Sequence, residues 1–284
     1  MSDLYFIASS NRDALADGRA ILTDAEARHV ARVMRKKIGD ELALFDGSGK
    51  EYRAKIVSIS KDRVDLDVLE TRVDDREPSL ALTVVMALPK GERQKWAIEK
   101  LVELGVKRVV PLDAERADVK FDDSTRERLV RQTIEATKQC GRLALMTITP
   151  SIAPKELPAF VELLNAKIQT SPASLSREAS ALAERFVDVG LFDEFAPGDD
   201  VLKAVAHPIS DGDFGQSSFS SLVKSRDYRP PRGATLLIGP VGGFTDAEVQ
   251  GAIDGGWSPL DLGRQVYRVE TAAIVASALF LHWE

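Results

Sequence analysis

The sequence predicts an α/β protein in which a small β-rich unit precedes a larger domain with a mainly parallel sheet. The strongest observation is the uninterrupted apolar run at residues 80–87, which is typical of a strand covered on both faces. A helix expected at residues 93–104 and a strand at residues 106–112 follow it. Strand, helix and strand in this order form a βαβ unit, whose two strands are parallel.

The first 70 residues or so contain several strand-like segments and little helix, which favours a small barrel or sandwich. Strands are expected at residues 4–8, 41–45, 52–57 and 64–68. Thr23–Glu26 reads as a capping box that opens a helix carrying the basic run Arg28–Lys37. The charged segment 70–79 marks the expected boundary, giving domains at 1–72 and 78–284.

The rest of the larger domain alternates between helix and strand patterns. A second capping box, Ser124–Glu127, predicts a helix that ends at Gly141. Residues 208–232 are polar and irregular. Further strands are expected at 146–149, 201–205 and 257–262, and helices at 154–166 and 177–189.

Composition indicates a cytoplasmic globular protein. Apolar residues make up 44% of the 284 and charged residues 29%, which allows a sizeable core. The single cysteine, Cys140, excludes an internal disulfide, and no signal peptide is evident. The longest apolar run, 272–283, is shorter than the roughly 20 residues that span a bilayer. A net charge of −6 argues against a nucleic-acid-binding protein. The basic run Arg28–Lys37 is either a solvated helix face or a local basic patch within this acidic chain.

Two glycine-containing loops near the end of the chain point to a ligand site. The apolar residues 236–238 lead into Gly239, Gly242 and Gly243, and Thr245–Glu248 then caps a helix. This loop matches neither a P-loop nor a dinucleotide fingerprint, and a tight turn alone would explain one or two of its glycines. The second loop, at Leu262 and Gly263, also follows a predicted strand. We therefore expect one small molecule between the loops, at the carboxyl edge of the sheet.

A series of six ordered motifs resembles the RsmE family of the SPOUT superfamily, bacterial methyltransferases of N3 of uridine 1498 in 16S ribosomal RNA. The match covers nearly the whole chain and is weakest at residues 165–232. The basic His29–Arg35 and the turn Phe45–Gly49 also fit. The six motifs are Pro89–Arg93, Glu103–Val106, Glu115–Arg116, Lys138–Arg142, Gly239–Phe244 and Leu262–Ala272.

The resemblance implies a PUA-like RNA-binding β-barrel followed by a SPOUT methyltransferase domain with a C-terminal trefoil knot. It also implies a homodimer, S-adenosylmethionine as cofactor, the small ribosomal subunit as partner, and no metal. The cofactor contacts carried over are Gly239, Gly242, Gly243, Leu262, Gly263, Tyr267, Arg268 and Thr271.

Methylation at N3 of uracil requires that a proton be removed or that the resulting charge be stabilised. Glu270 is the candidate base and Arg268 the candidate stabiliser. The alternatives are a first-turn Glu favoured by the helix dipole and a simple ion pair between the two residues. Trp96 belongs either to the core or to a dimer interface.

Seven basic residues are candidates for RNA contact, because phosphate contacts dominate affinity for nucleic acid. For Arg93 and Arg142, pairing with Glu92 or Glu103 is the alternative. The seven are Arg28, Arg32, Arg35, Lys36, Lys90, Arg93 and Arg142.

The chain departs from the family pattern at two places in the expected site. Val241 stands where the family usually has Glu, and Gln265 where it has Arg. Two other functions stay open, and the two departures motivate the second of them. One is ribose 2′-O-methylation of another RNA by the same fold, and the other is an RNA-binding assembly factor without catalysis.

Overall fold

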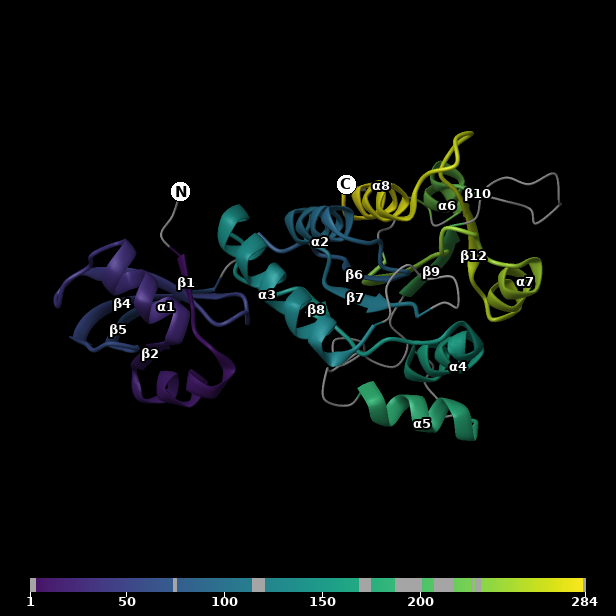
Figure 1. The fold of residues 1–284 in the computed structure, drawn as a ribbon. Helices are drawn as coiled ribbons and strands as arrows, with labels where there is room; N and C mark the ends of the chain where they lie inside the picture. The colour runs from purple at the N-terminus through teal and green to yellow at the C-terminus, as the bar shows by residue number, and fades with distance from the viewer. Residues whose placement is uncertain are drawn as a thin grey trace. The chain divides into compact units, whose positions relative to one another are not determined.

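The computed structural model describes residues 4–73, 76–113, 121–168, 175–186, 201–206, 217–225, 227 and 231–282. Contacts divide the chain into two compact units (Figure 1). The first comprises Met1–Glu77 and Thr133–Leu145, and the second Pro78–Gln132 and Met146–Glu284. The division therefore falls inside helix α3 (Asp123–Cys140), whereas the sequence had suggested a single cut near residue 75.

The first unit is a five-stranded sheet with the order β1-β3-β4-β5-β2. Neighbouring strands are antiparallel except β1 and β3, which are parallel. The four expected strands are present, and β2 was not predicted. Two register shifts between β4 and β5 bend the pair, as in small β-barrels. The strands are β1 (Leu4–Phe6), β2 (Arg19–Thr23), β3 (Glu41–Phe45), β4 (Lys50–Ile59) and β5 (Arg63–Val73).

The capping box expected at Thr23–Glu26 is wrong. Helix α1 (Asp24–Arg28) does begin after Thr23, but the Thr23 side chain caps no backbone N–H. Asp24 adopts a φ of 50°, and the Glu26 carboxylate accepts a hydrogen bond from Lys138 Nζ at 2.8 Å. A long-range partner has thus taken the carboxylate that a capping box needs. After α1 the chain continues as a π-helical turn, η2 (His29–Val33). A 3-10 helix, η1 (Ser9–Asp17), lies between β1 and β2.

The segment Thr133–Leu145 belongs to the first unit because of specific contacts. Leu143 packs in a buried cluster with Leu4 and Phe45. Burial disfavours the Lys138 ammonium, but the hydrogen bond and charge of Glu26 outweigh it, so the pKa of Lys138 is raised. This pair is mostly shielded from water.

Replacing Lys138 with methionine is expected to destabilise the protein by about 1–3 kcal/mol, because the Glu26 carboxylate would remain buried without its cation. Chemical denaturation followed by circular dichroism measures this loss. The double variant Glu26→Gln, Lys138→Met should recover part of it. A single Lys138→Met variant as stable as the wild type would show that the pair contributes nothing.

The second unit is built on a parallel seven-stranded sheet with the order β10-β12-β9-β11-β6-β7-β8. The expected βαβ unit is confirmed, since β6 and β7 are parallel and α2 connects them. Gly105 ends α2 with a φ of 93°. The strands are β6 (Ala81–Met86), β7 (Arg108–Pro111), β8 (Thr147–Ile148), β9 (Val201–Ala206), β10 (Ser217–Ser218), β11 (Gly233–Ile238) and β12 (Ser258–Asp261).

Helices cover both faces of this sheet (Figure 1). Helices α2 and α8 pack together on one face, where α8 contacts β6 and β11. On the other face α4 packs against α5 and α7. These helices are α2 (Glu92–Leu104), α4 (Leu157–Ile168), α5 (Arg177–Phe186), α7 (Asp246–Asp254) and α8 (Val269–Leu281).

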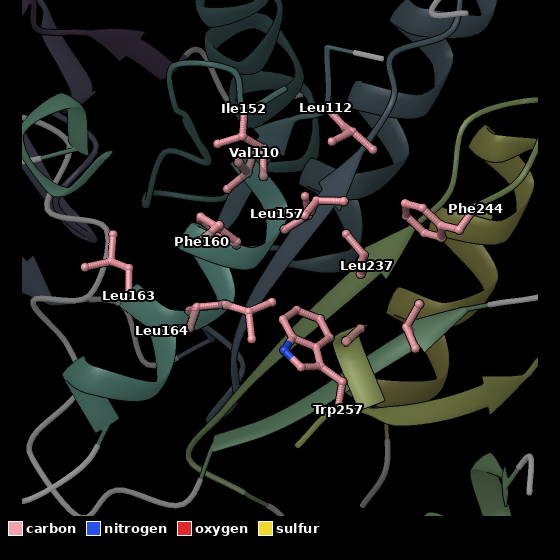
Figure 2. Close-up of a cluster of buried hydrophobic side chains, with 14 of the residues drawn as sticks. Val110, Leu112, Ile152, Leu157, Phe160, Leu163, Leu164, Leu237, Phe244 and Trp257 are labelled. Carbon is pink, nitrogen blue, oxygen red and sulfur yellow. The ribbon is translucent and has the colours of Figure 1, made fainter. Parts of the chain in front are cut away.

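The core between the sheet and α4, α5 and α7 is apolar. Figure 2 shows Leu157, Phe160 and Leu164 of α4 in one buried cluster with Leu237 of β11, Phe244 and Trp257. The continuous apolar strands β6 and β11 are buried along nearly their whole length. This is the two-sided burial that their sequence predicts.

Two further expectations need correction. Helix α3 is capped by Asp122, whose Oδ1 accepts from Thr125 N at 2.8 Å, so the expected box at Ser124–Glu127 is wrong. The helix starts earlier, which leaves Ser124 inside its first turn. The irregular segment 208–232 contains β10 and a short helix, α6 (Phe219–Ser225).

In the described ranges, no helix combines the length and hydrophobicity needed to cross a membrane.

Candidate functional site

A cavity of about 330 Å³ lies at the carboxyl ends of four neighbouring strands of the parallel sheet. Ala87 and Leu88 follow β6, Ala206 ends β9, Gly239 follows β11, and Asp261 ends β12. The first turn of α8 closes the remaining side. Open α/β sheets bind ligands at this edge. The position agrees with the expectation drawn from the two glycine loops.

The first loop forms a tight turn that feeds a capped helix. Gly243 N donates to Pro240 O at 2.8 Å, and Gly243 has a φ of 72°. A Cβ at Gly239 would lie 3.1 Å from the Phe244 ring, which leaves little room for a side chain. The capping box of α7 is confirmed, because Thr245 Oγ1 accepts from Glu248 N and Glu248 Oε2 accepts from Thr245 N.

The second loop is held by the side chain of the residue that ends β12. Asp261 Oδ1 accepts a hydrogen bond from Gly263 N at 2.8 Å. Gly263 has a φ of 118°, a conformation that residues with an L side chain rarely adopt. Both residues line the cavity. The carboxylate therefore fixes the loop and also contributes an acidic group to the cavity wall.

The charged groups of the cavity include a buried carboxylate. The Glu270 side chain is 6% exposed, and its Oε1 lies 3.8 Å from Nη1 of Arg93. Arg93 belongs to the first turn of α2, so this ion pair connects the starts of two helices. Arg268 also lines the cavity and is exposed to solvent. Arg93 was expected to pair with Glu92 or Glu103 as its alternative role, but it pairs with Glu270. Glu270 therefore does not form the ion pair with Arg268 that was the alternative for that residue.

Most of the predicted cofactor residues meet in this one cavity, but not all. Gly242 and Thr271 do not line it, and neither does Lys90, which was a candidate for RNA contact. The motif residues Glu115 and Arg116 lie outside the described residues. The predicted residues that line the cavity are Gly239, Gly243, Leu262, Gly263, Tyr267, Arg268, Glu270 and Arg93.

The sequence reading missed the apolar walls of the cavity. Ala87, Leu88, Ala206 and Phe244 look like ordinary core residues. The available signal was position, since Ala87, Leu88 and Ala206 stand at or directly after the ends of strands and Phe244 lies in the first glycine loop. Asp261 was also missed, although it precedes the second loop.

The remaining basic candidates belong to the first unit. Arg28, Arg32 and Arg35 are exposed, and Arg28 lies 3.9 Å from Asp62. Arg142 was expected to contact RNA, but its side chain is only 8% exposed. It donates from Nε and Nη2 to the two carboxylate oxygens of Glu77, at 2.8 and 2.7 Å. Arg142 therefore stabilises the junction of its own unit. The alternative of pairing holds, but with a different glutamate.

The cavity suits a small ligand with apolar and polar parts. Its walls are largely aliphatic and aromatic, and Asp261, Glu270, Arg93 and Arg268 supply convergent polar groups. Over the described stretches, no three His, Cys, Asp or Glu side chains are placed to hold a metal ion. Fold and site together define an α/β ligand-binding domain of the kind that carries its site in late loops, joined to a small β-sheet unit.

Comparison with known protein families gives this class a narrower definition. The RNA methyltransferase domain family matches residues 76–184 and 192–281, and the RNA methyltransferase PUA domain matches residues 22–69. The chain belongs to the RNA methyltransferase family, and the resemblance to RsmE proteins is confirmed.

Curated relatives agree over nearly the full length. The ribosomal RNA small subunit methyltransferase E of Bacillus subtilis (strain 168) is 29% identical, over 96% of this chain and 93% of the relative. The protein of that name from Synechocystis is 27% identical, over 94% of this chain and 74% of the relative.

Solved structures share the fold. A Legionella pneumophila protein solved with bound SAM is 27% identical, with a TM-score of 0.69 over 99% of this chain and 97% of that one. A ribosomal RNA small subunit methyltransferase E from Neisseria gonorrhoeae, solved with S-adenosyl methionine, is 22% identical. Its TM-score is 0.67 over 98% of this chain and 96% of that one. The expected class, an α/β methyltransferase domain after a PUA-like β unit, is confirmed.

Proposed function

We propose that this protein transfers a methyl group from S-adenosylmethionine to N3 of a uridine, uridine 1498, in the 16S RNA of the small ribosomal subunit. The observation that carries the proposal is the cavity between the two glycine turns, which is lined by both Glu270 and Arg268 together with apolar residues. The family and the relatives support ribosomal RNA as the substrate class. The position of the methyl group rests on the motif resemblance.

The residues present fit this cofactor. Gly243 and Gly263 have positive φ values that bring backbone groups to the cavity wall without a Cβ, and Gly239 packs against Phe244. Asp261 offers a carboxylate of the kind that binds ribose hydroxyls. Leu262, Tyr267 and the other lining residues of the second loop would hold the rest. When bound, the cofactor supplies an activated methyl group, so the protein provides binding and orientation.

The chain's own residues then handle the proton and the charge. Uracil N3 carries a proton at neutral pH, and in our proposal the Glu270 carboxylate accepts it. Arg268 stabilises the negative charge that develops on O2 or O4. Burial of Glu270 keeps water from competing for its oxygens. The target base must be unpaired, because N3 lies on its Watson–Crick edge.

RNA binding is proposed for the exposed basic residues Arg28, Arg32 and Arg35, together with Lys36 and with Lys90 of the second unit. Their positive charges suit a phosphate backbone within an otherwise acidic chain. The boundaries 1–72 and 78–284 are kept as functional domains, with Thr133–Leu145 serving as structural support for the first. This substrate implies activity in the cytoplasm.

A homodimer is also part of the proposal. Trp96 on α2 is 45% exposed, so it does not belong to the core of a single chain. Leu279 on the packed neighbour α8 is exposed as well. Exposed apolar side chains on paired helices are suited to cover each other in a second copy.

The proposed function predicts one missing methyl group in a deletion strain. Small-subunit RNA from that strain should lose a block to primer extension, and the restored gene should bring it back. Mass mapping of the nucleoside should find 3-methyluridine. A 2′-O-methylated nucleoside would favour the ribose methyltransferase. No binding of S-adenosylmethionine in calorimetry would favour the non-catalytic assembly factor, which the departures Val241 and Gln265 motivate.

A further inference from the structure

The ion pair between Arg93 and Glu270 links two parts of the cavity that are distant in sequence. Both residues line the cavity, and both lie in the first turn of their helices. Helices α2 and α8 pack against each other. The pair therefore sits where the two helices start, beside the second glycine loop.

The two partners are in different environments. The Glu270 side chain is almost fully buried, whereas about half of the Arg93 side chain is exposed. A buried carboxylate is costly unless it is paired or hydrogen bonded. The amino end of α8 favours a negative charge at Glu270, but this dipole does not fix the direction of the carboxylate. Arg93 is the charged partner from another element that the described structure gives to Glu270.

We propose that Arg93 is a positioning residue, whose guanidinium holds the Glu270 carboxylate in the orientation that accepts the substrate proton. It does so instead of binding an RNA phosphate. The inference rests on the proposed function, because Glu270 meets a substrate only if this cavity is the site of methyl transfer. Arg268 then remains available to the substrate, since Arg93 supplies the ion pair of Glu270.

The first test replaces Arg93 with alanine in the full-length protein and measures methyl transfer to unmodified small subunits. Turnover should fall by about ten- to a hundredfold, because a catalytic group displaced by about 1 Å loses this much. The calorimetric Kd for S-adenosylmethionine and the KM for subunits should stay within about twofold. Arg93→Lys should recover part of the loss, since lysine keeps the charge without the planar fork.

The second test combines Arg93→Ala with Glu270→Gln. If Arg93 acts through Glu270, the double variant should be no slower than Glu270→Gln alone. Multiplied losses would overturn the inference. A higher KM for subunits with unchanged turnover would also overturn it in favour of a phosphate contact. In that case the slope of log affinity for subunits against log salt concentration would fall by about one.

Two measurements separate this inference from the proposed function. A crystal structure of Arg93→Ala should show the Glu270 carboxylate in a changed rotamer, and an unchanged carboxylate would overturn positioning alone. Wild-type protein without methyl transfer to subunits would overturn the proposed function and the inference with it. The control is Lys100→Ala, which removes the exposed pair with Glu103 on the same helix and should leave turnover, Kd and KM unchanged.

Discussion

Replacing Glu270 with glutamine is expected to lower the turnover of methyl transfer at least tenfold. A loss of about a hundredfold or more is expected if the residue supplies full general-base catalysis. Glutamine has nearly the same shape as glutamate but accepts no proton. The affinity for S-adenosylmethionine should therefore be retained, which calorimetry checks while single-turnover kinetics measures the chemical step. Unchanged turnover would remove Glu270 as the base.

The alternative role of Glu270 is that of a first-turn acid which the helix dipole merely stabilises, and this alternative has a matched control. Glu178 lies in the first turn of α5, is exposed, and does not line the cavity. Glu178→Gln should cost stability similar to that of any lost dipole interaction, about 0.3–1 kcal/mol, and leave turnover unchanged. If both variants lost turnover equally, the effect would lie in helix stability and not in proton transfer.

The sheet of the second unit was predictable because its strands are buried on both faces. Residues 80–87 and 233–238 are almost continuously apolar, a pattern that only a covered strand requires. The start of α7 was predictable for a different reason. Both halves of its capping box come from Thr245 and Glu248, three residues apart, and no other residue in the described part of the chain competes for them.

The expectations that failed for Glu26 and Arg142 share a physical cause, which is competition from distant residues, whereas the box at Ser124–Glu127 lost to the nearby Asp122. Glu26 stands at the correct spacing for a capping box, yet Lys138 binds its carboxylate from 112 residues away. The same contact helps to bring Thr133–Leu145 into the first unit, for which no local pattern gives a signal. Arg142 likewise pairs with Glu77, which lies in the boundary segment 70–79 that the sequence suggested.

In the candidate site, too, local features could be predicted from the sequence and long-range contacts could not. Glycine loops could be located from the sequence because Gly243 and Gly263 mark backbone conformations that other residues avoid. The identity of the partner of Glu270 depended on how α2 packs against α8, which periodicity does not specify. The motif around Glu270 was enough to make it a candidate functional residue. Its charged partner, in contrast, is determined by the fold.

Replacing Gly263 with alanine is expected to weaken S-adenosylmethionine binding at least tenfold. At a φ of 118° an alanine is strained, and such strain costs about 1–3 kcal/mol. The second loop would relax away from the conformation that Asp261 holds, and the cavity wall would move with it. Calorimetry of the purified variant measures the loss.

Gly18→Ala is the control for this prediction, because Gly18 also has a positive φ, of 71°, and no atom within 4 Å of an added Cβ. It lies in the first unit, so the substitution should lower stability by about 1 kcal/mol without changing cofactor affinity. Thermal unfolding of both variants separates stability from binding. If folded Gly263→Ala protein bound the cofactor as tightly as the wild type, the ligand would not depend on the second turn, and a site built from both turns would be disproved.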